Sequence, residues 1–193
     1  MRKKILFIGL GRMGHPMAGY LSKTYSLYVY NRSSETVEKW LSEYPGQALQ
    51  NLTDIPQDLH AIISCVGDDH DLNALYLSEQ GLVNQAPSGT ILIDHTTSSA
   101  EIVQAINQAA IKKGLFWLDA PVSGGDVGAK EGKLVVMCGG ENDALERVRP
   151  LMDNYSRVVN LNGGPGQGQH TKMVNQIVLA GNMAGTVEGL MYA

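Results

Sequence analysis

Hydrophobic positions follow two periods along the first 161 residues of the chain. Short apolar runs of strand length end at glycine or polar residues, and the stretches between them repeat apolar side chains at helical intervals. The short runs predict strands over residues 4–8, 26–30, 59–66, 90–94, 115–119, 133–137 and 157–161. The longer stretches predict helices directly after the first strand and over residues 34–41, 71–77, 100–113 and 143–152. This alternation indicates βαβ units, so we expect an α/β fold with a doubly wound, mainly parallel sheet.

The pattern changes after residue 161. Residues 162–168 form a glycine-rich break, and residues 169–193 predict one long helix without any turn signal. Polar residues interrupt this helix too often for a membrane span, yet it is apolar on more than one side. Gly181, Gly185 and Gly189 recur at four-residue steps and would let another helix approach closely. We expect the remainder of a longer protein, or a partner chain, to cover this helix.

Three glycines mark the turn between the first strand and the first helix. Gly9, Gly11 and Gly14 have the spacing G-x-G-x-x-G, directly after a buried-strand pattern and at the start of a helical one. In that context Gly9 makes the turn, Gly11 lets the backbone approach a pyrophosphate, and Gly14 allows close packing of helix on strand. The motif predicts a Rossmann-type dinucleotide site, and a glycine turn in another α/β protein is the alternative. The candidate cofactor-binding residues are Gly9, Leu10, Gly11, Arg12, Met13, Gly14, Asn31, Arg32, Ser33, Val66 and Thr96.

The residues after the second strand bear on the choice of cofactor. A site for NAD usually carries an acidic residue about 20 positions after the glycines, which binds the ribose 2′-hydroxyl. Here Asn31 and Arg32 occupy that place, and a guanidinium can pair with a 2′-phosphate. We therefore predict NADP as the cofactor, with NAD possible. The alternative is that Arg32 only caps a surface turn.

Composition limits the binding partners and the cellular compartment that we expect for this chain. A formal charge of −4 offers no sign of binding to nucleic acid. Cys65 and Cys138 follow separate apolar runs, which indicates buried, reduced thiols of a cytoplasmic protein. The apolar run after the basic N-terminus stops at Gly9, too early for a signal peptide. The five histidines lack the spacing of metal ligands, so no metal site is expected.

Lys172 and Asn175 carry the candidate chemistry. They lie three residues apart at the start of the last predicted helix, so they project from one face. A lysine next to a nicotinamide could take a proton from an alcohol as hydride leaves and return it during reduction. Ser123, with the N–H groups of Gly124 and Gly125, would form a concavity suited to a carboxylate. Taken alone, however, Lys172 is as well interpreted as a solvated surface lysine, and the hydroxyls of residues 96–99 as helix caps.

Three segments, in order, resemble the hallmark motifs of the β-hydroxyacid dehydrogenases. They are FIGLGRMGHPMA, DAPVSGG and GQGQHTKMVNQ. This is the family of 3-hydroxyisobutyrate dehydrogenase and of glyoxylate/succinic semialdehyde reductase. The resemblance implies that the glycine loop and Met13 bind the dinucleotide and that Asn31-Arg32 belongs to an NADP-preferring branch. It further implies that Thr96 contacts the nicotinamide side, that Ser123, Gly124 and Gly125 bind the substrate carboxylate, that Lys172 is the acid/base and that Asn175 binds the substrate beside it.

The resemblance also implies a division of the chain into two domains, and the chain departs from the family pattern in two ways. Residues 1–162 would form the NADP-binding domain, and residues 163–193 would begin an α-helical domain for substrate binding and dimerisation. Members of the family continue through further helices that complete the pocket, and the usual proline after the Thr/Ser run is replaced by Ala100.

The sequence is therefore compatible with two functions. One is hydride transfer between NADP and a small hydroxyacid, semialdehyde or keto acid, such as 3-hydroxyisobutyrate, succinic semialdehyde or glyoxylate. The other is a truncated, non-catalytic NADP-binding module that acts through dimerisation. Gln176 after Asn175 disfavours a phosphogluconate dehydrogenase, and Lys172 disfavours an imine reductase.

Overall fold

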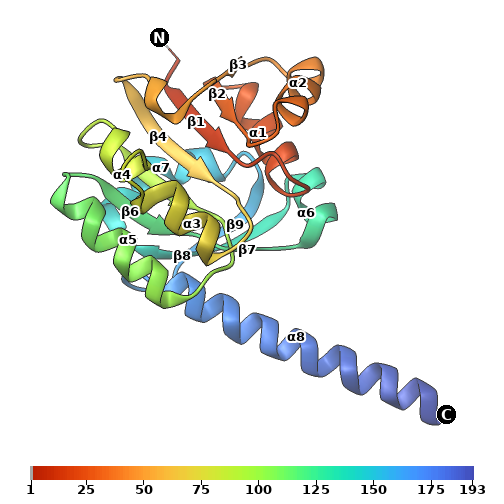
Figure 1. Ribbon diagram of the computed structural model, residues 1–193. Helices are drawn as coiled ribbons and strands as arrows, with labels where there is room; N and C mark the ends of the chain where they lie inside the picture. Colours follow the sequence, from red (N-terminus) through yellow and green to blue (C-terminus); the bar gives the residue numbers. More distant parts are fainter. Residues whose placement is uncertain (1) are drawn as a thin grey trace.

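The computed structural model describes residues 2–193, which form one twisted sheet between two layers of helices, with a long helix projecting from it (Figure 1). The strands are β1 (Lys4–Ile8), β2 (Ser26–Tyr30), β3 (Gln47–Ala48), β4 (Leu59–Ser64), β5 (Ile91–Asp94), β6 (Phe116–Asp119), β7 (Val122–Ser123), β8 (Leu134–Gly140) and β9 (Ser156–Leu161). Their order is β3-β2-β1-β4-β5-β6-β8-β7, and β9 pairs with β8. The first six strands are parallel, whereas β8 runs antiparallel to β6 and β7. The prediction of a doubly wound, mainly parallel α/β fold is confirmed.

Alternate residues of the central strands face opposite cores, because successive side chains of a strand point to opposite faces. In β1, Ile5 and Phe7 pack into one core, and Leu6 and Ile8 pack into the other. The first core lies under α1 (Gly14–Ser22), α2 (Ser34–Glu43), α6 (Gly125–Glu131) and α7 (Asn142–Met152). The second lies under η1 (Leu52–Asp54), α3 (Asp69–Leu72), η2 (Asn73–Leu77), α4 (Leu82–Gln85) and α5 (Ala100–Lys112). Burial on both faces explains why these strands are nearly continuous apolar runs.

Several element boundaries differ from the prediction. The helix expected over 71–77 begins at Asp69, because the Asp68 side chain accepts a hydrogen bond from the Asp71 N–H, and it continues as a π-helical turn over 73–77. The strand expected over 133–137 extends to Gly140, where it pairs with β6. The sequence pattern does not predict α6, because this helix is short and contains glycine. Burial of Ala129 against the core stabilises the helix.

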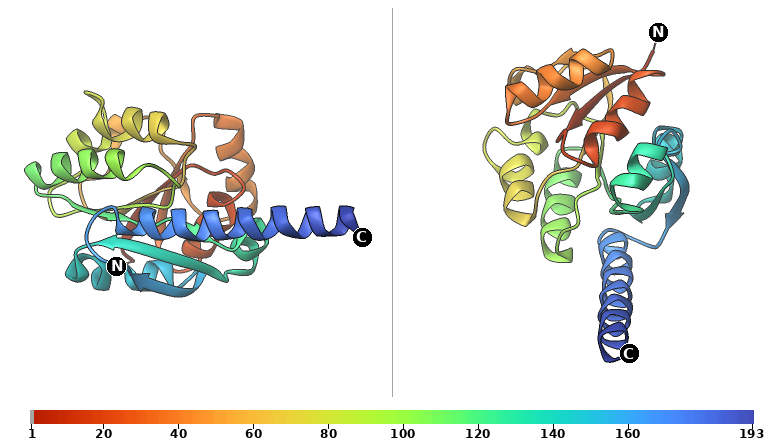
Figure 2. Two further views of the ribbon diagram at one scale, coloured as in Figure 1. Left: turned by 90° about the horizontal axis from the view of Figure 1, so that it is seen from below. Right: turned by 90° about the vertical axis from the view of Figure 1, so that its right-hand side faces the viewer.

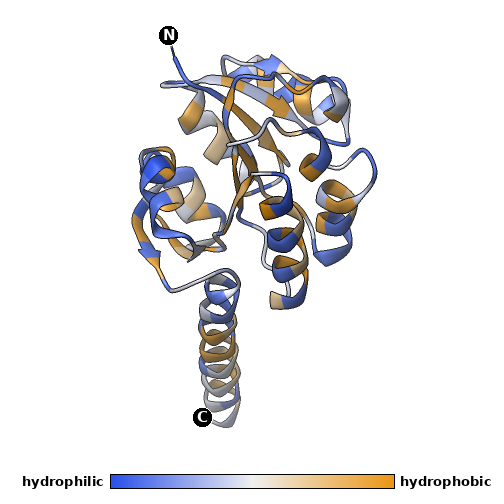
Figure 3. Ribbon diagram, turned by 90° about the vertical axis from the view of Figure 1, so that its left-hand side faces the viewer, coloured by the Kyte–Doolittle hydropathy of each residue, from blue (hydrophilic) through white to orange (hydrophobic). Residues whose placement is uncertain are grey.

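The last helix, α8 (Gln167–Tyr192), docks only through its first turns. It follows the loop in which the proposed boundary at residue 162 falls, and its start lies against β8, β6 and α5. Beyond Lys172 it runs away from the body of the molecule (Figure 2). Large apolar side chains of this helix are exposed from Met173 to Tyr192, and Figure 3 shows hydrophobic residues, in orange, along its ribbon. Within residues 2–193, no helix has the length and apolarity needed to cross a membrane.

Candidate functional site

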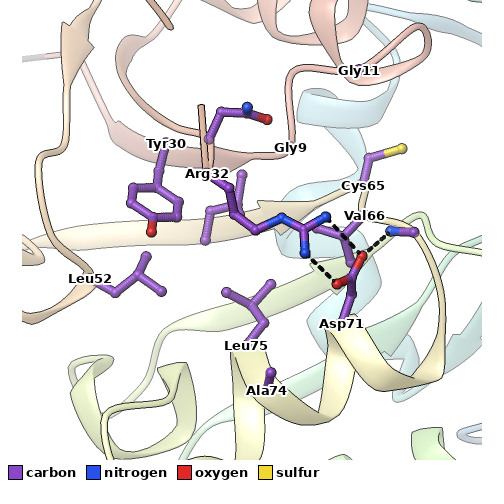
Figure 4. Close-up of a pocket in the computed structure, with 13 residues that line it drawn as sticks. Gly9, Gly11, Tyr30, Arg32, Leu52, Cys65, Val66, Asp71, Ala74 and Leu75 are labelled. Carbon is purple, nitrogen blue, oxygen red and sulfur yellow. Dashed lines mark hydrogen bonds and ion pairs between the residues drawn. The ribbon is translucent and has the colours of Figure 1, made fainter. Parts of the chain in front are cut away.

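A cleft of about 410 Å³ opens at the carboxyl ends of β1 and β4 (Figure 4). Gly9 and Gly11 line it from the first turn, and Val66 and Gly67 line it from the loop after β4. Chain connections leave β1 and β4 toward opposite faces of the sheet, so this is the place where the strand order reverses. Open α/β sheets bind their ligands in such a crevice.

Gly9 and Gly14 shape the turn that borders this cleft. Gly9 has a φ of +93°, a conformation that favours glycine, and its N–H donates to the Tyr30 carbonyl at 3.0 Å. A Cβ at Gly9 would overlap the Cys65 carbonyl oxygen. A Cβ at Gly14 would overlap the Gly9 carbonyl oxygen and lie 3.0 Å from the Phe7 ring. These two glycines therefore allow β1, the turn and α1 to pack closely.

Gly11 differs from the other two glycines, because a Cβ there would meet no atom within 4 Å. Inside residues 2–193, the N–H groups of Arg12 and Met13 donate to no acceptor, and α1 has no side-chain N-cap. Free N–H groups and the positive end of the helix dipole favour an anion at this position. The loop therefore fits the pyrophosphate of a dinucleotide.

The residues after β2 lie at the far end of the cleft and already have partners in the chain. The Asn31 side-chain oxygen accepts from the Leu10 N–H at 3.0 Å and so holds the glycine turn. Ser33 caps α2, because its hydroxyl accepts from the Thr36 N–H at 3.4 Å. Arg32 reaches across the cleft to Asp71, with 2.8 Å between Nη1 and Oδ1 (Figure 4). Arg32 thus lies on an exposed turn and also lines the cleft.

A second cleft of about 610 Å³ continues from the first and shares Cys65, Val66 and Gly67 with it. It brings together most of the residues predicted for the reacting end of the site. The residues that line it include Met13, Thr96, Ser123, Gly124, Gly125 and Lys172. Asn175 is not among them; its side-chain amide donates to the Gln176 side chain at 3.0 Å, and Gln176 and Leu179 face the cleft instead.

Lys172 is the buried amine of this second cleft. It is 8% exposed, and Nζ donates to the Val122 carbonyl at 2.9 Å. Burial lowers the pKa of Lys172 from its usual 10.5, because desolvation disfavours the charged ammonium. Lys172 lines the same cleft as Gly124 and Gly125, and its low exposure differs from that expected of a solvated surface lysine.

His95 also lines the second cleft, but both of its ring nitrogens have partners. Nδ1 lies 2.6 Å from the Ala120 carbonyl, which can only accept, and Nε2 lies 2.8 Å from the Tyr155 hydroxyl. Burial lowers the pKa of His95 to about 4. His95 is therefore a neutral residue with a structural role. No group of three or more potential metal ligands occurs among residues 2–193.

The chain matches the family described as the NAD binding domain of 6-phosphogluconate dehydrogenase over residues 4–164. It is 44% identical to an uncharacterized oxidoreductase of Shewanella frigidimarina, over 98% of this chain and 66% of that protein. Its fold superimposes on Mycobacterium tuberculosis 3-hydroxyisobutyrate dehydrogenase, determined with L-serine, with a TM-score of 0.87 and 26% identity, covering 93% of this chain and 61% of that one. The chain belongs to the β-hydroxyacid dehydrogenase family.

Within this family, the chain is also 37% identical to an NAD-dependent L-serine dehydrogenase of Pseudomonas aeruginosa, over 97% of this chain and 63% of that protein. The chain thus spans about two thirds of the length of the curated relatives it matches.

Around this family's nucleotide-binding cleft, a buried network holds Thr96 and Val66 in place. Asp94 Oδ1 accepts from the hydroxyls of Ser64 at 2.6 Å and Thr96 at 2.7 Å, and the Thr96 hydroxyl accepts from the Val66 N–H at 3.0 Å. The second Asp94 oxygen is buried without a partner among the described residues. Burial raises the pKa of Asp94 to about 7, against the hydrogen bonds from Ser64 and Thr96.

A second network holds the start of α8, and with it Lys172. The Asp119 carboxylate accepts from the N–H groups of Gly166 at 2.8 Å and Gln169 at 3.0 Å. The Gln169 side chain, 1% exposed, accepts from the Ser98 N–H at 3.0 Å and donates to the Thr96 carbonyl at 2.7 Å. Gln169 therefore ties the turn that carries Lys172 to the loop that carries Thr96.

Sequence reasoning missed Asp71, Asp94, Asp119 and Gln169. One signal was present for Gln169, which lies three residues before Lys172 and so shares its helix face. Asp94 and Asp119 end adjacent parallel strands, at the edge of the sheet where the site lies.

Proposed function

We propose that this chain carries the cofactor-binding and acid/base part of an oxidoreductase for small β-hydroxyacids, semialdehydes or 2-keto acids. The observation that carries the proposal is the buried Lys172 amine, which lies in a cleft continuous with a glycine-loop cleft suited to a dinucleotide. Substrates with a short carboxylate-bearing carbonyl or alcohol, such as 3-hydroxyisobutyrate, succinic semialdehyde or glyoxylate, match the chemistry of this cleft.

In this proposal each group of the second cleft has one task. The bound dinucleotide supplies or accepts the hydride. The neutral Lys172 amine takes the proton from the substrate hydroxyl during oxidation, and its ammonium form returns a proton to the carbonyl oxygen during reduction. Ser123, with the N–H groups of Gly124 and Gly125, binds the carboxylate. Asn175 binds the substrate or orients Lys172 once its side chain turns from Gln176.

We propose NADP as the preferred cofactor. Arg32 supports it, because its guanidinium lies at the adenosine end of the cleft and no acidic side chain follows β2 in the place typical of NAD sites. NAD is the second candidate, since a relative at 37% identity is an NAD-dependent dehydrogenase.

We also propose that α8 mediates homo-oligomerisation and that the protein is cytoplasmic. Exposed apolar side chains along α8 support the first, and the free thiols Cys65 and Cys138 support the second. The exposure of α8 also favours one alternative function, a non-catalytic NADP-binding module that acts through dimerisation, because the substrate side of the second cleft is open along Leu179.

Binding and turnover separate the two functions. We expect NADPH fluorescence to change on binding to the chain and to its Lys172→Ala variant alike. Reduction of succinic semialdehyde or glyoxylate should occur with the unmodified chain and fall by at least about 100-fold in the variant, the usual scale of lost general acid–base catalysis. Binding without turnover by either protein would favour the module, and turnover that survives in the variant would contradict the role of Lys172.

A further inference from the structure

The Arg32–Asp71 pair spans the adenosine end of the first cleft. Arg32 extends from the turn after β2, and Asp71 lies on α3 at the other wall (Figure 4). Two hydrogen bonds join them, at 2.8 Å from Nη1 to Oδ1 and at 3.4 Å from Nη2 to Oδ2. Among the described residues that line this cleft, Asp71 is the one with a carboxylate.

The two partners of this pair are held very differently. The Asp71 side chain is 19% exposed, and its Oδ2 also accepts from the Gly67 N–H at 3.1 Å. The Arg32 side chain is 83% exposed, and Asp71 is its one side-chain partner within residues 2–193. Asp71 is therefore the fixed member of the pair. It sets the position of the Arg32 guanidinium and partly neutralises its positive charge.

A 2′-phosphate bound by Arg32 would have to share the guanidinium with this carboxylate. Two anions on one guanidinium lie roughly 6–7 Å apart, where like charges still repel measurably. A free ribose 2′-hydroxyl carries no charge and meets no such repulsion. This repulsion thus acts on one of the two cofactors only.

We propose that Asp71 is a specificity-determining residue of the cofactor site, which opposes Arg32 and weakens its preference for a dinucleotide with a 2′-phosphate. The inference rests on the proposed function, because it requires the dinucleotide to lie in this cleft. It adds that cofactor choice is set by a pair of residues on two different walls. The chain therefore binds NADP with moderate preference over NAD.

The test is Asp71→Asn, which removes the charge and keeps an oxygen to accept from the Gly67 N–H. Dissociation constants are measured by calorimetry for adenosine 2′,5′-bisphosphate and AMP, which report on the adenosine end alone, and for NADPH and NADH. We expect the variant to bind the two 2′-phosphorylated ligands about three- to tenfold more tightly at low salt, and the gain to shrink as ionic strength rises. Affinity for AMP and NADH should stay within about twofold, since neither carries a 2′-phosphate that Asp71 could repel.

Two further variants serve as controls. Asp71→Glu keeps the charge and should retain the cofactor preference of the unmodified chain. Glu79→Gln removes one charge at an exposed position outside the lining of this cleft, and it should leave the preference unchanged.

Three results would overturn the inference. Weaker binding of the 2′-phosphorylated ligands by Asp71→Asn would show that Asp71 orients Arg32 in favour of the phosphate. Equal changes for phosphorylated and unphosphorylated ligands would show a structural role only. Binding of neither NADPH nor NADH by the unmodified chain would overturn the proposed function as well, which distinguishes that failure from the other two.

Discussion

Two glycines of the first turn, Gly14 and Gly11, have different surroundings, and we expect the first to matter for folding and the second for binding. Gly14 has no room for a side chain, because a Cβ would overlap the Gly9 carbonyl oxygen, whereas Gly11 has open space on the side of the cleft. The spacing G-x-G-x-x-G predicts this difference, and the contacts around Gly14 and Gly11 agree with it.

We predict different effects for alanine at these two glycines, on stability at Gly14 and on binding at Gly11. Gly14→Ala should lower the free energy of unfolding by about 1–3 kcal/mol or more, because β1 and α1 must move apart. Gly11→Ala should fold normally, since its Cβ meets no atom within 4 Å, yet weaken NADPH binding. Thermal unfolding and NADPH titration of both variants check this. Equal stability losses in the two would contradict it.

The ionisation of Lys172 gives a second prediction at this scale. Burial lowers its pKa, so the ammonium should lose its proton at a lower pH than the solvated lysines do. Oxidation of the alcohol, which needs the neutral amine, should then speed up as pH rises through this pKa, and reduction, which needs the ammonium, should slow down.

NMR titration of isotopically methylated lysines measures this pKa without requiring turnover, and Lys172→Arg identifies the signal. A Lys172 signal that titrates at or above the usual lysine pKa of 10.5 would contradict the prediction.

The residues that sequence reasoning found and missed differ in a physical way. Gly9 and Ser123 belong to local motifs, and Lys172 was favoured over a surface lysine only by the resemblance of its segment to a family motif. Asp71 and Gln169 act through partners 39 and about 70 positions away, at Arg32 and at the loop of Thr96 and Ser98. Only the fold creates those contacts, so a single sequence could not predict them.

At the scale of elements, the start of α8 is the joint that connects the turn carrying Lys172 to the loop carrying Thr96 and Ser98. Long periodic segments were predicted well, because burial on one or both faces sets their pattern. Short elements such as β7 and α6 were not, since tertiary contacts stabilise them, and the π-helical form of η2 within the helix expected over 71–77 was not predicted either. The position of α8 against β6 and β8 likewise depends on Asp119 and Gln169, outside any local pattern.

We predict that Gln169→Leu loosens this joint. The substitution leaves the Ser98 N–H and the Thr96 carbonyl buried without partners, at a cost of about 1–3 kcal/mol for each. Hydrogen exchange should accelerate over residues 166–172 and 95–99, and the free energy of unfolding should fall. Gln104→Leu is the matched control, because Gln104 also tethers this loop, through the Pro165 carbonyl, but is exposed. Similar exchange in the two variants would argue against the role given to Gln169.

At the scale of the whole molecule, α8 presents an apolar surface that the described chain does not cover. Ile177 is 71% exposed and Leu190 is 74% exposed, on a helix that projects from the body (Figure 2). Contiguous apolar surface of this kind is typical of a face that another chain or a further part of the protein covers.

We therefore predict that the 193-residue chain self-associates through α8. Sedimentation should show an oligomer for the unmodified chain and a shift toward monomer for Ile177→Lys combined with Leu190→Lys, because the lysines would have to be desolvated at the interface. Asn182→Lys, at an exposed polar position of the same helix, should have a smaller effect. A monomeric unmodified chain at high concentration would refute the prediction.

The most direct measurement is a crystal structure of the chain with NADP bound. We predict that the pyrophosphate contacts the N–H groups of Arg12 and Met13, and that the nicotinamide ring lies in the second cleft between Thr96 and Lys172. A nucleotide bound elsewhere, or a nicotinamide ring directed away from Lys172, would contradict the proposed function.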